Sequence, residues 1–159
     1  MKEKLSWQMI GAAFILVAAA GLIQNTDTLN AFGIKPNLAL AVLVALAFFI
    51  TTLFVYSALV LTAVAFLRFE GGFELSTLVF AIVAFLVFWL CEKLPGKNFI
   101  NNILSIGLAT LVFYLAADPA FFINDTISVI KEGVYNIIIG SAVFALASAF
   151  VYGKKRAQF

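Results

Sequence analysis

The sequence has no histidine and only one cysteine, Cys91, among its 159 residues. Histidine is the commonest general base and metal ligand in proteins, so the most familiar catalytic and metal-binding side chain is missing. A single cysteine can form neither an intrachain disulfide nor a thiolate metal site. These absences argue against an enzyme, a metal centre and a disulfide-stabilised secreted domain, and we expect no cofactor.

Charge is also scarce, because charged residues make up 11% of the chain, against about 25% in a typical soluble domain. Hydrophobic residues make up 64%, and the mean hydropathy is +1.11. Too few polar side chains remain to cover a water-facing surface. The composition therefore predicts an integral membrane protein, and it excludes a soluble domain, a disordered chain and a nucleic-acid-binding protein.

The eight acidic residues all lie outside the middle of the apolar runs. A buried acid inside a span is the usual mark of a proton relay or an ion-coupled carrier, so neither function is predicted. The acids expected on one side of the membrane include Glu70, Glu74, Asp118, Asp125 and Glu132. Their spacing matches no metal-binding loop, which favours a solvated acidic rim over a cation site.

The apolar runs predict an all-α transmembrane bundle of six spans, forming a single domain over residues 1–159. The expected spans are 7–23, 38–50, 53–67, 75–91, 99–117 and 134–152. A span of the hydrocarbon core takes about 20 apolar residues. Residues 38–67 are ambiguous, because they can form one long tilted helix, two short spans or a re-entrant hairpin. Residues 120–133 are expected to form a longer loop, with a short amphipathic segment at the membrane interface as an open alternative.

The placement of basic residues favours two crossings within residues 38–67. With six spans, seven basic residues, including Lys2, Lys4 and the tail 154–156, lie on one side and three on the other, whereas six of the eight acids lie on the second side. With five spans the basic residues divide six to four. Basic residues collect on the cytoplasmic side of a membrane. Six spans are therefore predicted, with both termini in the cytoplasm and the second and third spans forming a short hairpin.

Small residues recur on the last predicted span. Ser141, Ala145 and Ala149 follow one another at intervals of four residues, and Gly140 and Ser148 widen the same face. Small side chains let two helices approach closely within a membrane. Packing inside the bundle is the simpler interpretation, and docking of another membrane protein is the alternative.

The connection between the first and second predicted spans carries the most distinctive residues. Gln24 ends the first span, and Lys35, Pro36 and Asn37 lead into the second. In these residues, in its length and in its six-span layout with a basic C-terminal tail, the chain resembles the rod-shape-determining MreD family. Many members of that family end the third helix in a Gly-Leu-x-x-Asp pattern, whereas residues 63–67 here hold no acid.

The resemblance implies a non-enzymatic scaffold of the bacterial inner membrane that takes part in cell elongation and peptidoglycan synthesis. It implies binding to an MreC-type partner with a single span, in addition to the lipid bilayer. The alternative is the substrate-binding subunit of an energy-coupling-factor importer for a vitamin or a metal, which has a similar six-helix layout. The small number of polar residues within the predicted spans argues against that alternative. The oligomeric state and the identity of any ligand stay open.

Overall fold

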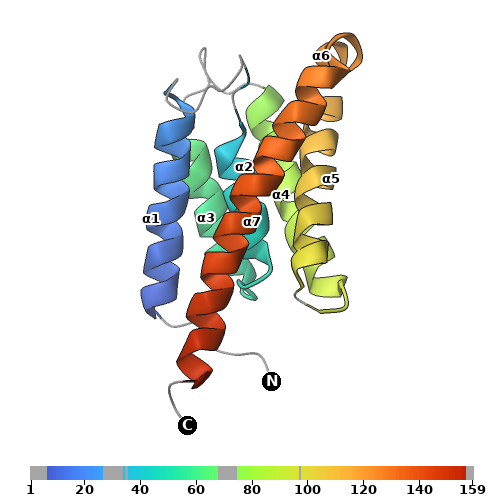
Figure 1. Cartoon of the computed structure of the whole chain (residues 1–159). Coiled ribbons are helices and arrows are strands. Elements are labelled where there is room, and N and C mark those ends of the chain that lie inside the picture. Colours follow the sequence, from blue (N-terminus) through green and yellow to red (C-terminus); the bar gives the residue numbers. More distant parts are fainter. Residues whose placement is uncertain (1–6, 27–33, 35, 68–74, 97, 157–159) are drawn as a thin grey trace.

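The structure is a computed structural model that describes residues 7–26, 34, 36–67, 75–96 and 98–156, with side chains as far as residue 151. The described residues form seven α-helices, which Figure 1 shows standing side by side as a bundle. The helices are α1 (Trp7–Gln24), α2 (Leu38–Ala47), α3 (Leu53–Phe66), α4 (Leu75–Lys93), α5 (Phe99–Ala117), α6 (Pro119–Asn124) and α7 (Thr126–Arg156). The predicted all-α fold is confirmed.

Helix α2 forms the centre of the bundle. All ten of its residues are buried, and it packs against α1, α3, α4, α5 and α7. A helix that is apolar on every side is expected in the interior of a protein. In Figure 1, α1 and α7 lie on the near side of α2, with α4 and α5 beside and behind it. The surrounding helices therefore turn one face towards α2 and leave the other face exposed.

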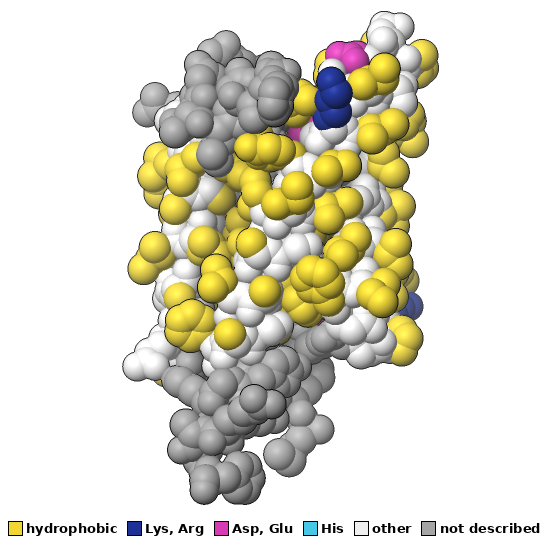
Figure 2. Space-filling view, viewed as in Figure 1, with side chains coloured by type: hydrophobic (Ala, Val, Ile, Leu, Met, Phe, Trp, Pro, Cys, Tyr) yellow, Lys and Arg dark blue, Asp and Glu magenta, His cyan; other side chains and the backbone are white. Residues whose placement is uncertain are grey.

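Four helices are long and apolar enough to cross a membrane: α1, α4, α5 and the part of α7 from Thr126 to Val151. Their outer faces carry exposed apolar side chains such as Ile15, Leu104 and Phe150. Figure 2 shows apolar side chains distributed over the described part of the face in view. An exposed apolar surface of this extent marks contact with a membrane or another protein. The chain is therefore a multi-pass membrane protein.

Residues 38–67 form two short helices, α2 and α3, rather than one long helix. In the break that follows α2, Phe48 and Phe49 are buried. Their rings pack against Phe144 of α7, with ring centroids 5.7 Å and 5.0 Å apart. This aromatic contact holds the break inside the bundle, and the long tilted helix is excluded.

The segment 120–133, for which the sequence predicts a loop, is almost entirely helical. Helix α6 begins after Asp118, whose Oδ1 accepts a hydrogen bond from the Phe121 N–H. Helix α7 begins after Asp125, whose Oδ1 accepts a hydrogen bond from the Ser128 N–H. Side-chain caps of this kind satisfy the open N–H groups of a new helix. The last helix therefore begins eight residues earlier than the predicted span 134–152, at residue 126.

Gly21 marks a close approach of α1 to α3. A Cβ atom at Gly21 would lie 2.9 Å from Cβ of Phe66, whereas a Cβ atom at Gly11 of the same helix would meet nothing within 4 Å. We expect Gly21→Ala to destabilise the bundle by about 1 kcal/mol, because α1 and α3 must move apart. We expect Gly11→Ala to leave stability unchanged or slightly raised. Thermal unfolding midpoints in detergent measure both effects, and equal midpoints for the two variants would contradict this prediction.

Candidate functional site

A group of polar side chains lies inside the bundle where α5, α7 and the start of α2 meet. Glu132 of α7 is 5% exposed, and Asn136, one turn further along, is 0% exposed. Thr110 and Tyr114 of α5 contact them through hydrogen bonds. We call these four residues the polar centre. The prediction that no acid lies inside a span is therefore wrong, because Glu132 is buried within the part of α7 that is long and apolar enough to cross a membrane.

Hydrogen bonds join the polar centre across the interface of α5 and α7. The Tyr114 hydroxyl donates to Glu132 Oε2. The Asn136 amide donates to the Thr110 hydroxyl at 3.1 Å, and that hydroxyl donates to the Ile106 carbonyl at 3.0 Å. The Glu132 carboxylate also lies near the side chain of Asn136 and near the backbone of Asn37, the residue that caps α2. The carboxylate is thus placed at the junction of α5, α7 and the start of α2.

The start of α2 is capped by side chains from two directions. Asn37 Oδ1 accepts a hydrogen bond from the Leu40 N–H at 3.2 Å, and Gln24 Oε1 at the end of α1 accepts one from the Ala39 N–H at 3.0 Å. These bonds satisfy N–H groups that a helix leaves open at its first turn. The positive end of the helix dipole of α2 therefore lies beside Glu132.

The residues that carry the family resemblance meet at this same place. Gln24 and Asn37 cap α2, and Pro36, directly before the cap, is buried. Lys35 lies outside the described residues. Three of the four residues singled out between the first two spans thus lie at the start of α2, and one of them, Asn37, lies beside Glu132 of the polar centre.

The buried side-chain atoms without a hydrogen-bond partner, among the described residues, all belong to α5 and α7. In the polar centre they are Glu132 Oε1 and Asn136 Oδ1. Further along the same two helices they are the Ser141 hydroxyl and both ends of the Asn102 amide. An unsatisfied buried polar atom costs about 1–3 kcal/mol. A bound ion or polar ligand would therefore gain the most binding free energy at the interface of α5 and α7, where it can satisfy these atoms.

The small-residue face predicted on the last span divides between the inside and the outside of the bundle. Gly140 is buried, and a Cβ atom there would lie 3.1 Å from a backbone carbonyl oxygen of α2. Ala145 and Ala149 are exposed, and Ser141 and Ser148 are half-buried. Gly140 thus packs within the bundle, whereas Ala145 and Ala149 face lipid or another protein.

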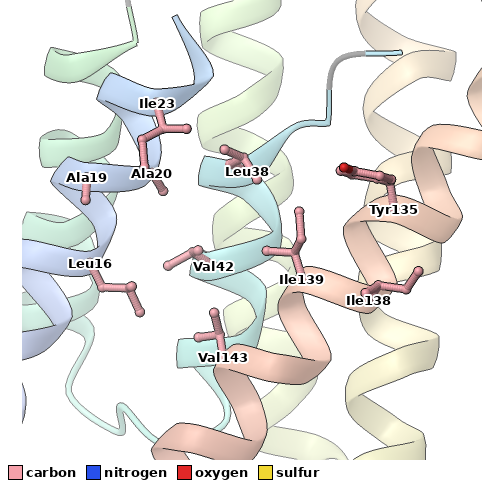
Figure 3. Close-up of a pocket in the computed structure, with 10 residues that line it drawn as sticks. All are labelled: Leu16, Ala19, Ala20, Ile23, Leu38, Val42, Tyr135, Ile138, Ile139 and Val143. Atoms are coloured by element: carbon pink, nitrogen blue, oxygen red, sulfur yellow. The ribbon is translucent and has the colours of Figure 1, made fainter. Parts of the chain in front are cut away.

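A groove with a volume of about 400 Å³ lies between α1 and α7, over α2 (Figure 3). Helices α1 and α7 both pack on α2 but hardly touch each other. The groove is lined by Leu16, Ala19, Ala20 and Ile23 of α1, Leu38 and Val42 of α2, and Tyr135, Ile138, Ile139 and Val143 of α7. The only polar side-chain group among them is the hydroxyl of Tyr135, so the groove suits hydrocarbon or an apolar side chain.

The polar centre can bind a ligand through one carboxylate, one phenol, one amide and one hydroxyl. In the part of the chain that the structure describes, no three His, Cys, Asp or Glu residues gather as a metal-binding group. The sequence contains a signal for this site, because Thr110 and Tyr114, like Glu132 and Asn136, are four residues apart and so share a helix face. Comparisons with protein-family models, with curated proteins and with solved structures find no match to this chain.

Proposed function

We propose that the protein is a non-enzymatic membrane scaffold that binds other membrane proteins through the outer face of α7 and the adjoining groove. The observation that carries this proposal is the exposure of Ala145 and Ala149 on the same helix as the groove-lining Ile138. Small exposed side chains let a second helix come close to the backbone of α7. The groove on the same helix can take up an apolar side chain of the second helix. The contact would then combine close backbone packing with a side chain seated in the groove.

The proposed topology has six spans with both termini in the cytoplasm. Helices α2 and α3 have 10 and 14 residues, so at about 1.5 Å per residue each is shorter than the hydrocarbon core. A short helix with an irregular end is tolerated at membrane depth where protein surrounds it, as protein surrounds α2. The uneven distribution of basic and acidic residues along the chain supports the same topology.

The proposed cellular role follows the resemblance to the MreD family. In this role the protein lies in a bacterial inner membrane, takes part in cell elongation and peptidoglycan synthesis, and binds an MreC-type partner with a single span. The capping of α2 by Gln24 and Asn37 supports the proposal, because the residues that carry the resemblance act together in one structural unit.

Site-specific crosslinking tests the scaffold. We expect a photoreactive residue at position 145 or 149 to capture a single-span membrane protein with a coiled-coil segment, and one at Ala109, which is 2% exposed, to capture none. We expect Ala145→Leu to reduce recovery of that partner about fivefold or more, the effect of losing roughly 1 kcal/mol, with no change in the thermal midpoint of the bundle. Equal capture at position 109, or unchanged recovery with Ala145→Leu, would contradict the scaffold.

The polar centre is the one observation that favours the alternative of an importer subunit. A buried carboxylate can hold a positively charged group of a substrate. Several polar side chains also lie in the interior, because Thr77, Asn102, Ser105, Thr110, Glu132 and Asn136 are all buried. Co-purification distinguishes the two functions. A pair of ATPase subunits recovered with the protein would support the importer and refute the scaffold.

A further inference from the structure

We infer that the polar centre binds a monovalent alkali cation such as Na⁺, through Glu132 Oε1 and Asn136 Oδ1. This inference goes beyond the scaffold and does not depend on it. Both atoms are buried acceptors without a hydrogen-bond partner among the described residues. Because they belong to residues four apart on one helix, they lie on the same face of α7.

The two hydroxyl groups of the polar centre are already engaged as donors. The Tyr114 hydroxyl donates to the other carboxylate oxygen, Oε2. The Asn136 amide nitrogen donates to the Thr110 hydroxyl, and that hydroxyl donates in turn to a backbone carbonyl of α5. Rotating either hydroxyl to reach Oε1 or Oδ1 would break one of these bonds. A cation needs no acceptor and therefore satisfies both oxygens without disturbing the network.

The charge of the site also calls for a cation. An ionised carboxylate is costly to bury unless it is paired. The first turn of α2 offers about half an elementary positive charge, which offsets only part of the carboxylate charge. Lys131, the neighbour of Glu132 in the chain, is exposed and lies on a different face of α7. No described basic side chain therefore completes the neutralisation of Glu132.

The chemistry of the oxygens selects a monovalent cation. One carboxylate balances one positive charge, and the remaining ligands are neutral. Ca²⁺ takes about 6–8 oxygen ligands, commonly with several carboxylates, and Mg²⁺ keeps several waters. Transition metals prefer imidazole and thiolate ligands, and the described residues hold no group of three His, Cys, Asp or Glu. A single positive charge, such as that of Na⁺, therefore matches the one carboxylate of the polar centre better than a divalent ion does.

A cation in this place would hold three parts of the bundle together. Glu132 belongs to α7, accepts a hydrogen bond from Tyr114 of α5 and lies beside Asn37, the residue that caps α2. It lies six residues after the first residue of α7, or about 9 Å along the helix axis, so the site is near one end of the bundle. Binding of Na⁺ at the polar centre should therefore stabilise the packing of α2, α5 and α7.

The test compares Na⁺ with choline at equal ionic strength, on the full-length protein purified in detergent. We expect saturable binding of radioactive ²²Na⁺ at one ion per chain, and a thermal midpoint that rises with NaCl and reaches a plateau. Glu132→Gln should abolish both effects, and Asn136→Leu should weaken Na⁺ binding about tenfold, the loss of roughly 1.4 kcal/mol. Glu92→Gln, which changes an exposed acid of α4, is the control and should leave both effects intact.

Three results would overturn the inference. The first is an absence of saturable ²²Na⁺ binding to the wild-type protein, which needs no variant and so decides the matter even if Glu132→Gln fails to fold. The second is an equal rise in thermal midpoint with NaCl and choline chloride, which would reflect ionic strength alone. The third is a midpoint that depends on pH but not on Na⁺, which would place a proton on Glu132 instead of a metal ion.

Discussion

Replacing Gly140 by leucine should destabilise the bundle by about 3 kcal/mol or more, the upper part of the range for overpacked cores. Even the Cβ atom of a larger residue would lie 2.4 Å from Ile106 Cδ1 and 3.1 Å from the carbonyl oxygen of Ala41. The Ile106 methyl group can rotate away, but the Ala41 carbonyl belongs to the backbone of α2. Because α2 is enclosed by five other helices, it cannot retreat without disturbing all of them.

Two matched variants on the same helix separate this contact from a general intolerance of leucine in α7. At Gly133 the nearest atom to an added Cβ is Thr110 Cγ2, 4.0 Å away, and Ala145 is exposed. We therefore expect Gly133→Ala and Ala145→Leu to keep the wild-type thermal midpoint in detergent, Gly140→Ala to lower it moderately, and Gly140→Leu to lower it most. A wild-type midpoint for Gly140→Leu would show that α7 does not pack on α2 in this way.

The bounds of α1 and α5, but not the start of α7, could be predicted from the sequence. The prediction 99–117 agrees with α5, and 7–23 agrees with α1 to within one residue. Lipid and the protein interior are both apolar, so a helix in a membrane bundle is apolar around most of its surface and its limits appear in composition alone. The same uniformity hides which face of each helix turns inward, so the position of α2 at the centre could not be predicted.

The polar centre could not be predicted from the sequence, because the hydropathy criterion that located the spans placed Glu132 outside them. Asp125, Lys131 and Glu132 lower the local hydropathy, so a composition criterion assigns residues 120–133 to a loop. In the structure, Lys131 and Glu132 belong to α7. The Glu132 carboxylate is stabilised by a hydrogen bond from Tyr114, which lies 18 residues earlier in the chain. A contact between two helices depends on their relative rotation, which hydropathy does not encode.

The small-residue face shows a second limit of one-dimensional spacing. Successive residues of an α-helix are about 100° apart, so steps of four residues drift by about 40° each. Two such steps lead from Ser141 to Ala149, and Gly140 lies about 100° before Ser141 around the helix. Gly140 and Ala149 therefore lie on nearly opposite sides of α7, with Gly140 towards α2. Gly140 is consequently buried and Ala149 exposed, although the sequence places them in one group.

Removing the Tyr114 hydroxyl should destabilise the protein by about 1.5–3 kcal/mol, the usual range for a hydrogen bond to a charged group. Tyr114→Phe keeps the ring, which packs against Phe113 and Phe121, and removes only the donor to Glu132. Tyr135→Phe is the matched control, because its hydroxyl lies at the apolar groove (Figure 3). We expect its thermal midpoint to stay at the wild-type value.

A double-mutant cycle shows whether the loss belongs to the pair of Tyr114 and Glu132. Glu132→Leu should cost less in the Tyr114→Phe background than in the wild type, because the first change has already left the carboxylate without its donor, and a coupling of about 0.5–3 kcal/mol is expected. Additive losses would show that the two side chains do not stabilise each other. If Na⁺ binds at the polar centre, the coupling should be smaller in NaCl than in choline chloride, since the ion then holds the carboxylate in place of the missing hydroxyl.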